Sequence, residues 1–227
     1  MRLNRAGAVA GALYLVLGFL WLLVGAPANA WLVATWLVIV ALVGLFVPGF
    51  ANQVSLARAY LAAPAFVYGL AGEYGFLALA VALAGLTDLV DGTIARRFAQ
   101  PSNFGGGLDP VVDGLFTGAL CVGLALGGAF PLWLALVVIA RYLVPALGGG
   151  VLLAMGSRPE LRHTLTGQVS TILILVLVGG ACLFRALSQD STGWVRGAEI
   201  VIPVATAATF VHLAWAARRP VAAREPG

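Results

Sequence analysis

Four of the chain's five aspartates lie within a stretch of 26 residues that is otherwise largely apolar; they are Asp88, Asp91, Asp109 and Asp113. Carboxylates are rare in membrane-embedded sequence and usually face a functional cavity or a partner, so each is a candidate site residue. Asp88 and Asp91 are spaced i, i+3, and Asp109 and Asp113 are spaced i, i+4, so each pair lies along one face of a helix. The segment 97–104 contains a proline and a serine and can turn the chain. The spacing therefore predicts two acidic helical faces that meet.

Four ionised carboxylates in a small volume of low dielectric constant repel one another, so protons or cations must compensate their charge. Oxygen donors without histidine or cysteine nearby suit Mg²⁺, Mn²⁺ or Ca²⁺ rather than zinc. Four carboxylates are enough to bridge two such ions about 3.5–4 Å apart, an arrangement that clamps a phosphate or pyrophosphate. Gly92, Ala95 and Gly105 share the acidic faces. Their small size either lets a ligand approach the backbone or lets helices pack closely.

The elements that must position these aspartates are membrane-spanning helices. Of the 227 residues, 61% are hydrophobic and 10% are charged, which excludes a soluble globular domain. Apolar runs separated by charged residues, glycine and proline predict eight helical spans, so the sequence predicts an all-α integral membrane protein. The predicted spans are 6–24, 31–46, 56–70, 74–98, 107–126, 130–155, 165–184 and 195–217.

Arginines are distributed unequally between the two ends of these spans. Ten lie on the side of the N-terminus and two, Arg185 and Arg196, on the other side, while Arg141 lies within a span. The asymmetry predicts that both termini and the aspartates lie on the cytoplasmic side of the plasma (inner) membrane. No basic run could follow a phosphate backbone, so no nucleic-acid partner is expected. The ten arginines are Arg2, Arg5, Arg58, Arg96, Arg97, Arg158, Arg162, Arg218, Arg219 and Arg224.

One motif joins the acidic and the small residues. The chain reads Asp88-x2-Asp91-Gly92-x2-Ala95-Arg96-x8-Gly105-x3-Asp109-x3-Asp113. This resembles the full motif of the CDP-alcohol phosphatidyltransferase family (class I), with all eight positions matched, and eight residue types at set spacing rarely match by chance. The resemblance begins near Asn52. It implies a six-helix family domain in residues 51–217, preceded by two additional helices in 1–50 and followed by a short cytoplasmic tail, 218–227.

Upstream of this motif, Asn52-x2-Ser55-x2-Arg58 resembles the Asn-x2-Thr-x2-Arg element of several branches of the family. The alternative is structural: Asn52 would cap a helix, and Arg58 would extend its side chain to the membrane surface. Together with the main motif, the resemblance implies a place near the nucleotide or the acceptor.

A second short stretch, Ala140-Arg141-Tyr142, resembles the Ala-Arg-Glu sequence of phosphatidylglycerophosphate and cardiolipin synthases, with Tyr142 in place of the acid. An arginine within a span needs a partner. Arg141 is therefore expected either to bind an anionic acceptor or to pair with one of the aspartates.

The segment 167–171 resembles a family segment in which a lysine follows glycine, but here Gln168 replaces the lysine. Arg158, Arg162 and His163 could supply the missing charge. The alternative is that they belong to a loop that faces anionic lipid.

The resemblance implies an enzyme that transfers a phosphatidyl group from CDP-diacylglycerol to an alcohol hydroxyl and releases CMP. It implies two divalent cations, Mg²⁺ or Mn²⁺, one held by Asp88, Asp91 and Asp109 and the other by Asp88, Asp109 and Asp113. Asp113 is the expected base for the acceptor hydroxyl. A homodimer in the lipid bilayer is also expected from the family.

The other candidate site residues form two groups. Those expected to bind the nucleotide are Asn52, Ser55, Gly92, Ala95, Arg96 and Gly105. Those expected to bind the acceptor are Arg58, Arg141, Arg158 and Arg162. Their positive charge favours an anionic acceptor, glycerol 3-phosphate or phosphatidylglycerol, and leaves inositol phosphate, serine and an uncharged polyol open.

Two other functions fit part of the pattern. A family member without activity could serve as a lipid-binding partner, because Tyr142 and Gln168 depart from related branches. A cation- or proton-coupled transporter could use the intramembrane aspartates, although inverted repeats are not evident and the glycines in register would have no role. CMP release identifies the enzyme, and metal-dependent ion flux would identify the transporter.

Overall fold

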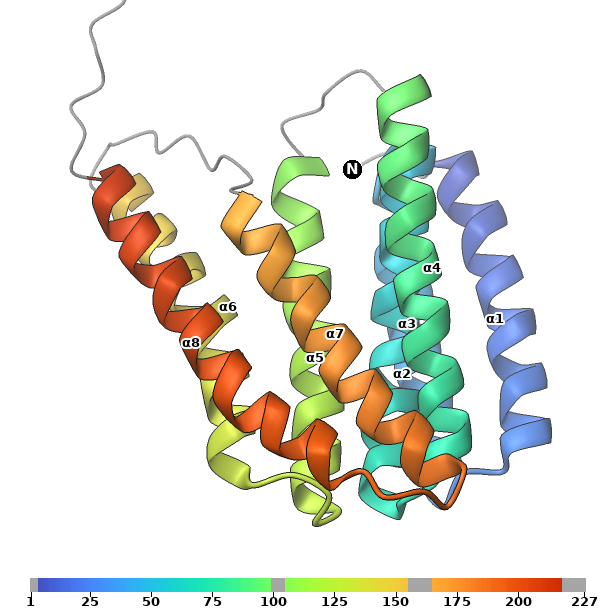
Figure 1. The fold of residues 1–227 in the computed structure, drawn as a ribbon. Helices are drawn as coiled ribbons and strands as arrows, with labels where there is room; N and C mark the ends of the chain where they lie inside the picture. The colour runs from blue at the N-terminus through green and yellow to red at the C-terminus, as the bar shows by residue number, and fades with distance from the viewer. Residues whose placement is uncertain (1–3, 99–104, 155–164, 218–227) are drawn as a thin grey trace, which may run out of the picture.

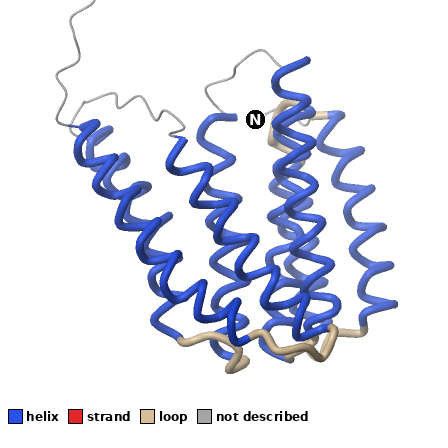
Figure 2. The backbone as a smooth tube through the Cα atoms, in the orientation of Figure 1, coloured by secondary structure: helices blue, strands red, loops and turns tan. Residues whose placement is uncertain are grey.

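The computed structural model of the chain describes residues 4–98, 105–154 and 165–217 (Figure 1). Within these ranges Figure 2 shows helices joined by loops and no strand, so the predicted all-α fold is confirmed there. The helices are α1 (Arg5–Gly25), α2 (Ala30–Gly44), α3 (Phe50–Ala71), α4 (Tyr74–Phe98), α5 (Gly105–Leu126), α6 (Leu132–Ala154), α7 (Leu165–Ala186) and α8 (Thr192–Ala217).

Each predicted span coincides with one helix. By length and composition, α1, α3, α5, α7 and α8 can cross a membrane. The apolar parts of the other three helices are shorter, namely Ala30–Gly44, Tyr74–Thr87 and Leu132–Gly148. The chain is thus an all-α integral membrane protein, and the number of eight membrane crossings stays a prediction.

The start of α3 differs from the expected boundary. The helix begins at Phe50 rather than at residue 56, because polar residues in its first turns are buried against other helices instead of ending it. Gln53 is only 1% exposed, and its Nε2 donates to the carbonyl oxygens of Gly44, at 2.9 Å, and Val47, at 2.8 Å. The two polar residues at 52 and 53 lower the local hydropathy, which is why the span predicted from hydropathy began only at residue 56.

Six of the helices form a closed ring. Contacts run from α3 to α4, α7, α8, α6, α5 and back to α3. Helices that follow one another in the sequence run in opposite directions (Figure 1). The first two helices contact each other and lie against α3. Apolar residues of α2 and α3, among them Leu37, Val40, Leu56 and Val67, form the core between them. α3 is therefore enclosed on several sides and is the most buried of the long apolar helices.

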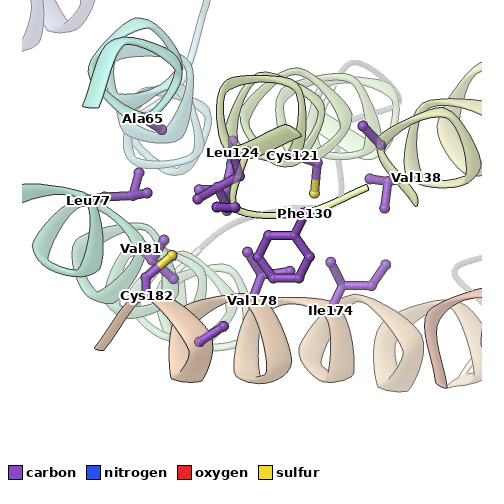
Figure 3. Packing of buried hydrophobic residues seen from close by; sticks show 14 of the residues in the cluster. Ala65, Leu77, Val81, Cys121, Leu124, Phe130, Val138, Ile174, Val178 and Cys182 are labelled. Atoms are coloured by element: carbon purple, nitrogen blue, oxygen red, sulfur yellow. The ribbon is translucent and has the colours of Figure 1, made fainter. Parts of the chain in front are cut away.

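The interior of the ring is apolar toward one end. We call this the apolar end; there the loops 72–73, 127–131 and 187–191 join the helices. Figure 3 shows side chains of α4, α5 and α7, together with Phe130, directed at one another, and Leu77, Leu124 and Val178 are at most 1% exposed. The other end, where α4 finishes at Phe98 and α5 begins at Gly105, carries the motif aspartates and is called the acidic end.

Polar contacts join the loops of the apolar end. The guanidinium of Arg185 donates to the hydroxyl of Tyr74, the carbonyl of Ala129 and the hydroxyl of Ser191, each at 3.0 Å. These bonds connect the segment 185–191 with Tyr74 and Ala129, which are distant from it in the sequence. At the start of α8, the hydroxyl and the backbone amide of Thr192 donate to Asp190, which lowers the pKa of this exposed carboxyl group. The apolar end is thus fixed by both packing and hydrogen bonds.

The approach of α3 to α5 requires glycine. An added Cβ at Gly123 would lie 2.4 Å from the carbonyl oxygen of Phe66, and one at Gly127 would lie 2.3 Å from that of Gly69. Because these obstacles are backbone atoms, the helices would have to separate. We expect Gly123→Ala to lower the free energy of unfolding by about 1–3 kcal/mol, as overpacking does.

Thermal unfolding in detergent measures this effect. Gly85→Ala is the matched control, because a Cβ at Gly85, also inside a helix, meets nothing within 4 Å. The stability of that variant should be unchanged or slightly higher, since alanine has a higher helix propensity than glycine. Equal stability of the two variants would mean that α3 and α5 do not depend on this close contact.

Candidate functional site

The acidic end contains an arginine on α3 that faces two carboxylates on α5. Nη1 of Arg58 contacts Oδ1 of Asp113, and Nη2 lies 3.7 Å from Oδ1 of Asp109. The two aspartates are one helical turn apart, so a single guanidinium can reach both. Side-chain exposure is 4% for Arg58, 37% for Asp109 and 21% for Asp113. The predicted acidic face of α5 is thus directed at α3.

Asp88 and Asp91 lie in the second half of α4, toward the acidic end. Their side chains are outside the described residues, as are those of Ala95 and Arg96. The backbone of these four residues, and of Gly92 and Gly105, is helical. Both α4 and α5 contact α3, so the two acidic stretches flank the same helix. The meeting of the four carboxylates stays a prediction.

The described carboxylates have the chemistry of a hard-cation site. Oδ1 of Asp109 is buried and accepts no hydrogen bond within the described part of the chain. A buried carboxylate oxygen with spare acceptor capacity suits Mg²⁺ or Mn²⁺. Among the side chains that the structure describes, no group of three or more acidic, histidine or cysteine residues is placed to hold a metal, and two of the four predicted ligands are not among them. The donor types fit a divalent cation.

Asn52, Ser55 and Arg58 follow one another at intervals of three along the first turns of α3. The alternative that Asn52 caps the helix and that Arg58 extends to the membrane surface was wrong. Gly49 occupies the cap position, and Nδ2 of Asn52 donates to the carbonyl oxygen of Pro48 at 2.6 Å. Arg58 points into the protein and not to the membrane surface, because α3 begins a turn and a half earlier than expected. Ser55 is 3% exposed and shares this buried region.

Arg141 on α6 is buried among hydroxyl groups of α7 and α8. Its Nη1 contacts Oγ of Ser170 and donates to Oγ1 of Thr209 at 3.3 Å. Its Nη2 donates to the carbonyl oxygen of Gly167 at 2.8 Å and to Oγ1 of Thr171 at 3.1 Å. Arg141 is 5% exposed, and its Nε is buried without a hydrogen bond in the described structure.

Arg141 was expected either to bind an anionic acceptor or to pair with an aspartate, and its described partners bear on both expectations. All are neutral, and none of them is an aspartate within the described ranges. A buried guanidinium without a carboxylate partner is costly in a medium of low dielectric constant. This environment favours an anion near Arg141. Arg158 and Arg162, the other candidates for an anionic acceptor, lie outside the described residues.

Sequence reasoning missed several residues near the acidic end. Ser170 and Thr171 belong to a segment that was singled out, but without their role as acceptors for Arg141. Thr209 is 68 residues away from Arg141, and nothing in its surroundings marks it. Tyr142 lies over Gly114: a Cβ added to Gly114 would be 2.9 Å from the Cβ of Tyr142. The ring of Tyr142 therefore packs on α5 next to Asp113. A glycine directly after a motif aspartate was the available signal.

Comparisons with known proteins add independent information. The family model described as CDP-alcohol phosphatidyltransferase matches residues 49–215. A protein of Streptomyces coelicolor named cardiolipin synthase (CMP-forming) is 33% identical over 62% of this chain and 63% of its own length. A probable cardiolipin synthase (CMP-forming) of Drosophila melanogaster is 30% identical over 70% of this chain and 54% of its own length.

A probable phosphatidylglycerophosphate synthase of Mycobacterium tuberculosis is 31% identical over 43% of this chain and 46% of its own length. The chain thus spans about half to two thirds of the length of the first curated relatives that it matches. No solved structure matches it.

Proposed function

Because the chain belongs to the CDP-alcohol phosphatidyltransferase family, we propose that it transfers a phosphatidyl group from CDP-diacylglycerol to an alcohol hydroxyl. The observation that carries the proposal is the placement of Asp109 and Asp113 on the face of α5 that meets α3. The other two motif aspartates are on α4, which contacts the same helix. Relatives named cardiolipin synthase and phosphatidylglycerophosphate synthase support a role in phospholipid synthesis.

In the proposed reaction, the acceptor hydroxyl loses its proton to Asp113 while its oxygen attacks the phosphorus atom that carries the diacylglycerol. The bond from this phosphorus to the bridging pyrophosphate oxygen breaks, and CMP leaves with the bonding electrons. Two divalent cations, Mg²⁺ or Mn²⁺, would neutralise the pyrophosphate and the leaving CMP. They would be held by two overlapping sets, Asp88, Asp91 and Asp109 for one and Asp88, Asp109 and Asp113 for the other.

The substrates are assigned to two sides of the acidic face. The residues proposed to contact the nucleotide are Asn52, Ser55, Gly92, Ala95, Arg96 and Gly105. For the acceptor we propose an anionic alcohol, glycerol 3-phosphate or phosphatidylglycerol, near Arg141, Arg158 and Arg162. Support comes from the buried Arg141, whose described partners carry no negative charge. Arg58 belongs at the acceptor side too, because it contacts the proposed base.

The place of the reaction follows from the distribution of charge and apolar surface. Arginines at the acidic end favour the cytoplasmic side of the plasma (inner) membrane for this end and for both termini. There a nucleotide head group can approach from water while the acyl chains stay in the bilayer. We propose residues 51–217 as the catalytic domain, with the helices in 1–50 as an addition, a cytoplasmic tail at 218–227, and a homodimer as the assembly.

The test is CMP release by the purified protein in mixed micelles that contain CDP-diacylglycerol and Mg²⁺ or Mn²⁺. The acceptors to compare are glycerol 3-phosphate, phosphatidylglycerol, inositol phosphate, inositol and serine. We expect CMP release with one anionic acceptor, its loss after chelation with EDTA, and its recovery when Mn²⁺ is added back.

Other outcomes would identify the alternatives. Binding of CDP-diacylglycerol without CMP release from any acceptor would indicate a lipid-binding family member without this activity. Metal-dependent ion flux in liposomes that contain no CDP-diacylglycerol would indicate a transporter. Absence of both binding and release would refute the proposed function.

A further inference from the structure

We propose that Arg58 is a positioning residue and a built-in counter-cation of the acidic face, which competes with divalent cations for Asp109 and Asp113. The inference rests on the proposed function in one respect, namely that these carboxylates serve as cation ligands. It adds a role for an α3 residue outside the eight-position motif: Arg58 weakens cation binding by the substrate-free protein and holds Asp113 in place for turnover.

Two carboxylates of α5 lie against the guanidinium of Arg58. Each of its two terminal nitrogens faces a different carboxylate, Nη1 at Asp113 and Nη2 at Asp109, the latter at 3.7 Å. The side chain is 4% exposed, so water screens these interactions only weakly. Because an arginine in a protein keeps its proton, this positive charge is permanent. The two carboxylates therefore have a counter-charge before any metal arrives.

The surrounding packing keeps Arg58 at this position. Leu56, Ala59 and Tyr60, its neighbours on α3, are buried in the core shared with α2. Toward the apolar end, α3 and α5 touch through the backbone at Gly69 and Gly123. The helix that carries the arginine is thus fixed against the helix that carries the aspartates. Moving the guanidinium away would require a change of side-chain conformation within a packed region, and not a shift of the helix.

The consequence for a divalent cation is electrostatic. A cation that binds Asp109 or Asp113 must share their negative charge with the guanidinium and is repelled by it at a distance of a few ångströms. An anionic pyrophosphate beside the cation would compensate this repulsion, so cation binding and nucleotide binding should support each other. Arg58 thereby favours a cation-loaded site with the substrate present over one without it.

The consequence for Asp113 is geometric. The contact between Nη1 and Oδ1 restricts rotation of this carboxylate, which orients the proposed base. Removing the guanidinium should therefore change two quantities in opposite directions. Cation affinity should rise because repulsion is lost, and turnover should fall because the base is less well held. A variant that is merely misfolded would lose both.

The experiment compares Mn²⁺ binding by the full-length protein in detergent, without CDP-diacylglycerol or acceptor, from the electron paramagnetic resonance signal of free Mn²⁺. We expect Arg58→Gln to bind Mn²⁺ about tenfold more tightly than the wild type, since it removes one nearby positive charge. Arg58→Lys keeps the charge and should stay within about twofold of the wild type. Arg196→Gln is the matched control, because Arg196 is exposed on α8 near the apolar end, and the Mn²⁺ affinity of this variant should not change.

The same proteins are then assayed for CMP release, where Arg58→Gln should lower kcat with less effect on the KM for the acceptor. Unchanged or weaker Mn²⁺ binding by a folded Arg58→Gln protein overturns the proposal. The absence of Mn²⁺ binding by both the wild type and Arg58→Gln overturns it as well. Equal tightening in Arg58→Lys would attribute the effect to geometry and also overturn it. If the glutamine variant does not fold, Arg58→Met provides the same loss of charge.

The outcome can be separated from that of the proposed function. The Mn²⁺ titrations contain no substrate. They compare the Mn²⁺ affinity of proteins with and without the positive charge at position 58, whether or not the protein releases CMP. Failure of the wild type to release CMP with any acceptor would refute the proposed activity and leave the Mn²⁺ comparison valid.

Discussion

Asp113→Asn should lower kcat for CMP release by about 10²- to 10⁴-fold, the usual contribution of a general base. The amide has nearly the shape of the carboxylate and its oxygen can still accept from Arg58, so the α3–α5 contact is kept. What is lost is the ability to take the proton of the acceptor hydroxyl. The measurement is CMP release at saturating CDP-diacylglycerol and acceptor, over a range of Mn²⁺ concentrations that separates loss of the base from loss of cation binding.

Asp190→Asn is the matched control for this variant. Asp190 is exposed at the apolar end, where it accepts from Thr192, so its replacement should leave kcat unchanged. Full turnover by Asp113→Asn with unchanged Mn²⁺ dependence would remove Asp113 from the role of base. A normal kcat that is reached only at higher Mn²⁺ concentrations would make it a cation ligand alone.

Arg141→Gln should raise the KM for the anionic acceptor by about 10- to 100-fold. A hydrogen bond to a charged group contributes about 1.5–3 kcal/mol, and about 1.4 kcal/mol corresponds to a tenfold change in binding. The glutamine can still bond to Ser170 or Thr171, which keeps part of the contact between α6 and α7. The KM for CDP-diacylglycerol should stay close to that of the wild type, because the proposed nucleotide residues lie on α3, α4 and α5.

Steady-state kinetics with each substrate varied in turn distinguishes these effects. Arg196→Gln, a change of the same type at an exposed position of α8 near the apolar end, should affect neither KM. Arg141→Lys keeps the charge and should recover part of the acceptor affinity, although it lacks the two-pronged geometry of arginine. An unchanged acceptor KM in Arg141→Gln, or an equal rise in both KM values, would show that Arg141 stabilises the helices and does not bind the acceptor.

The local features of the molecule were determined by the sequence itself. Helix positions follow from apolar runs of sufficient length, because a backbone in a bilayer must satisfy its hydrogen bonds within the segment. The eight motif positions are local as well: they occupy 26 consecutive residues, and their helical spacing alone places Asp109 and Asp113 on one face of α5. For this reason the eight helices and the acidic face of α5 could be predicted without coordinates.

The partners of the two buried arginines were decided only by the tertiary structure. Arg58 and Asp113 are 55 residues apart, and Arg141 and Thr209 are 68 apart. Hydropathy gives the existence of α3, α5, α6 and α8, but not which faces meet, since apolar faces of helices can pack on one another in many ways. The choice depends on where backbones can approach, as Gly123 allows for α3 and α5, and on polar groups that must find partners inside the bundle. That is why Arg58 was expected near the nucleotide or the acceptor, or at the membrane surface, and was found against the carboxylates of Asp109 and Asp113.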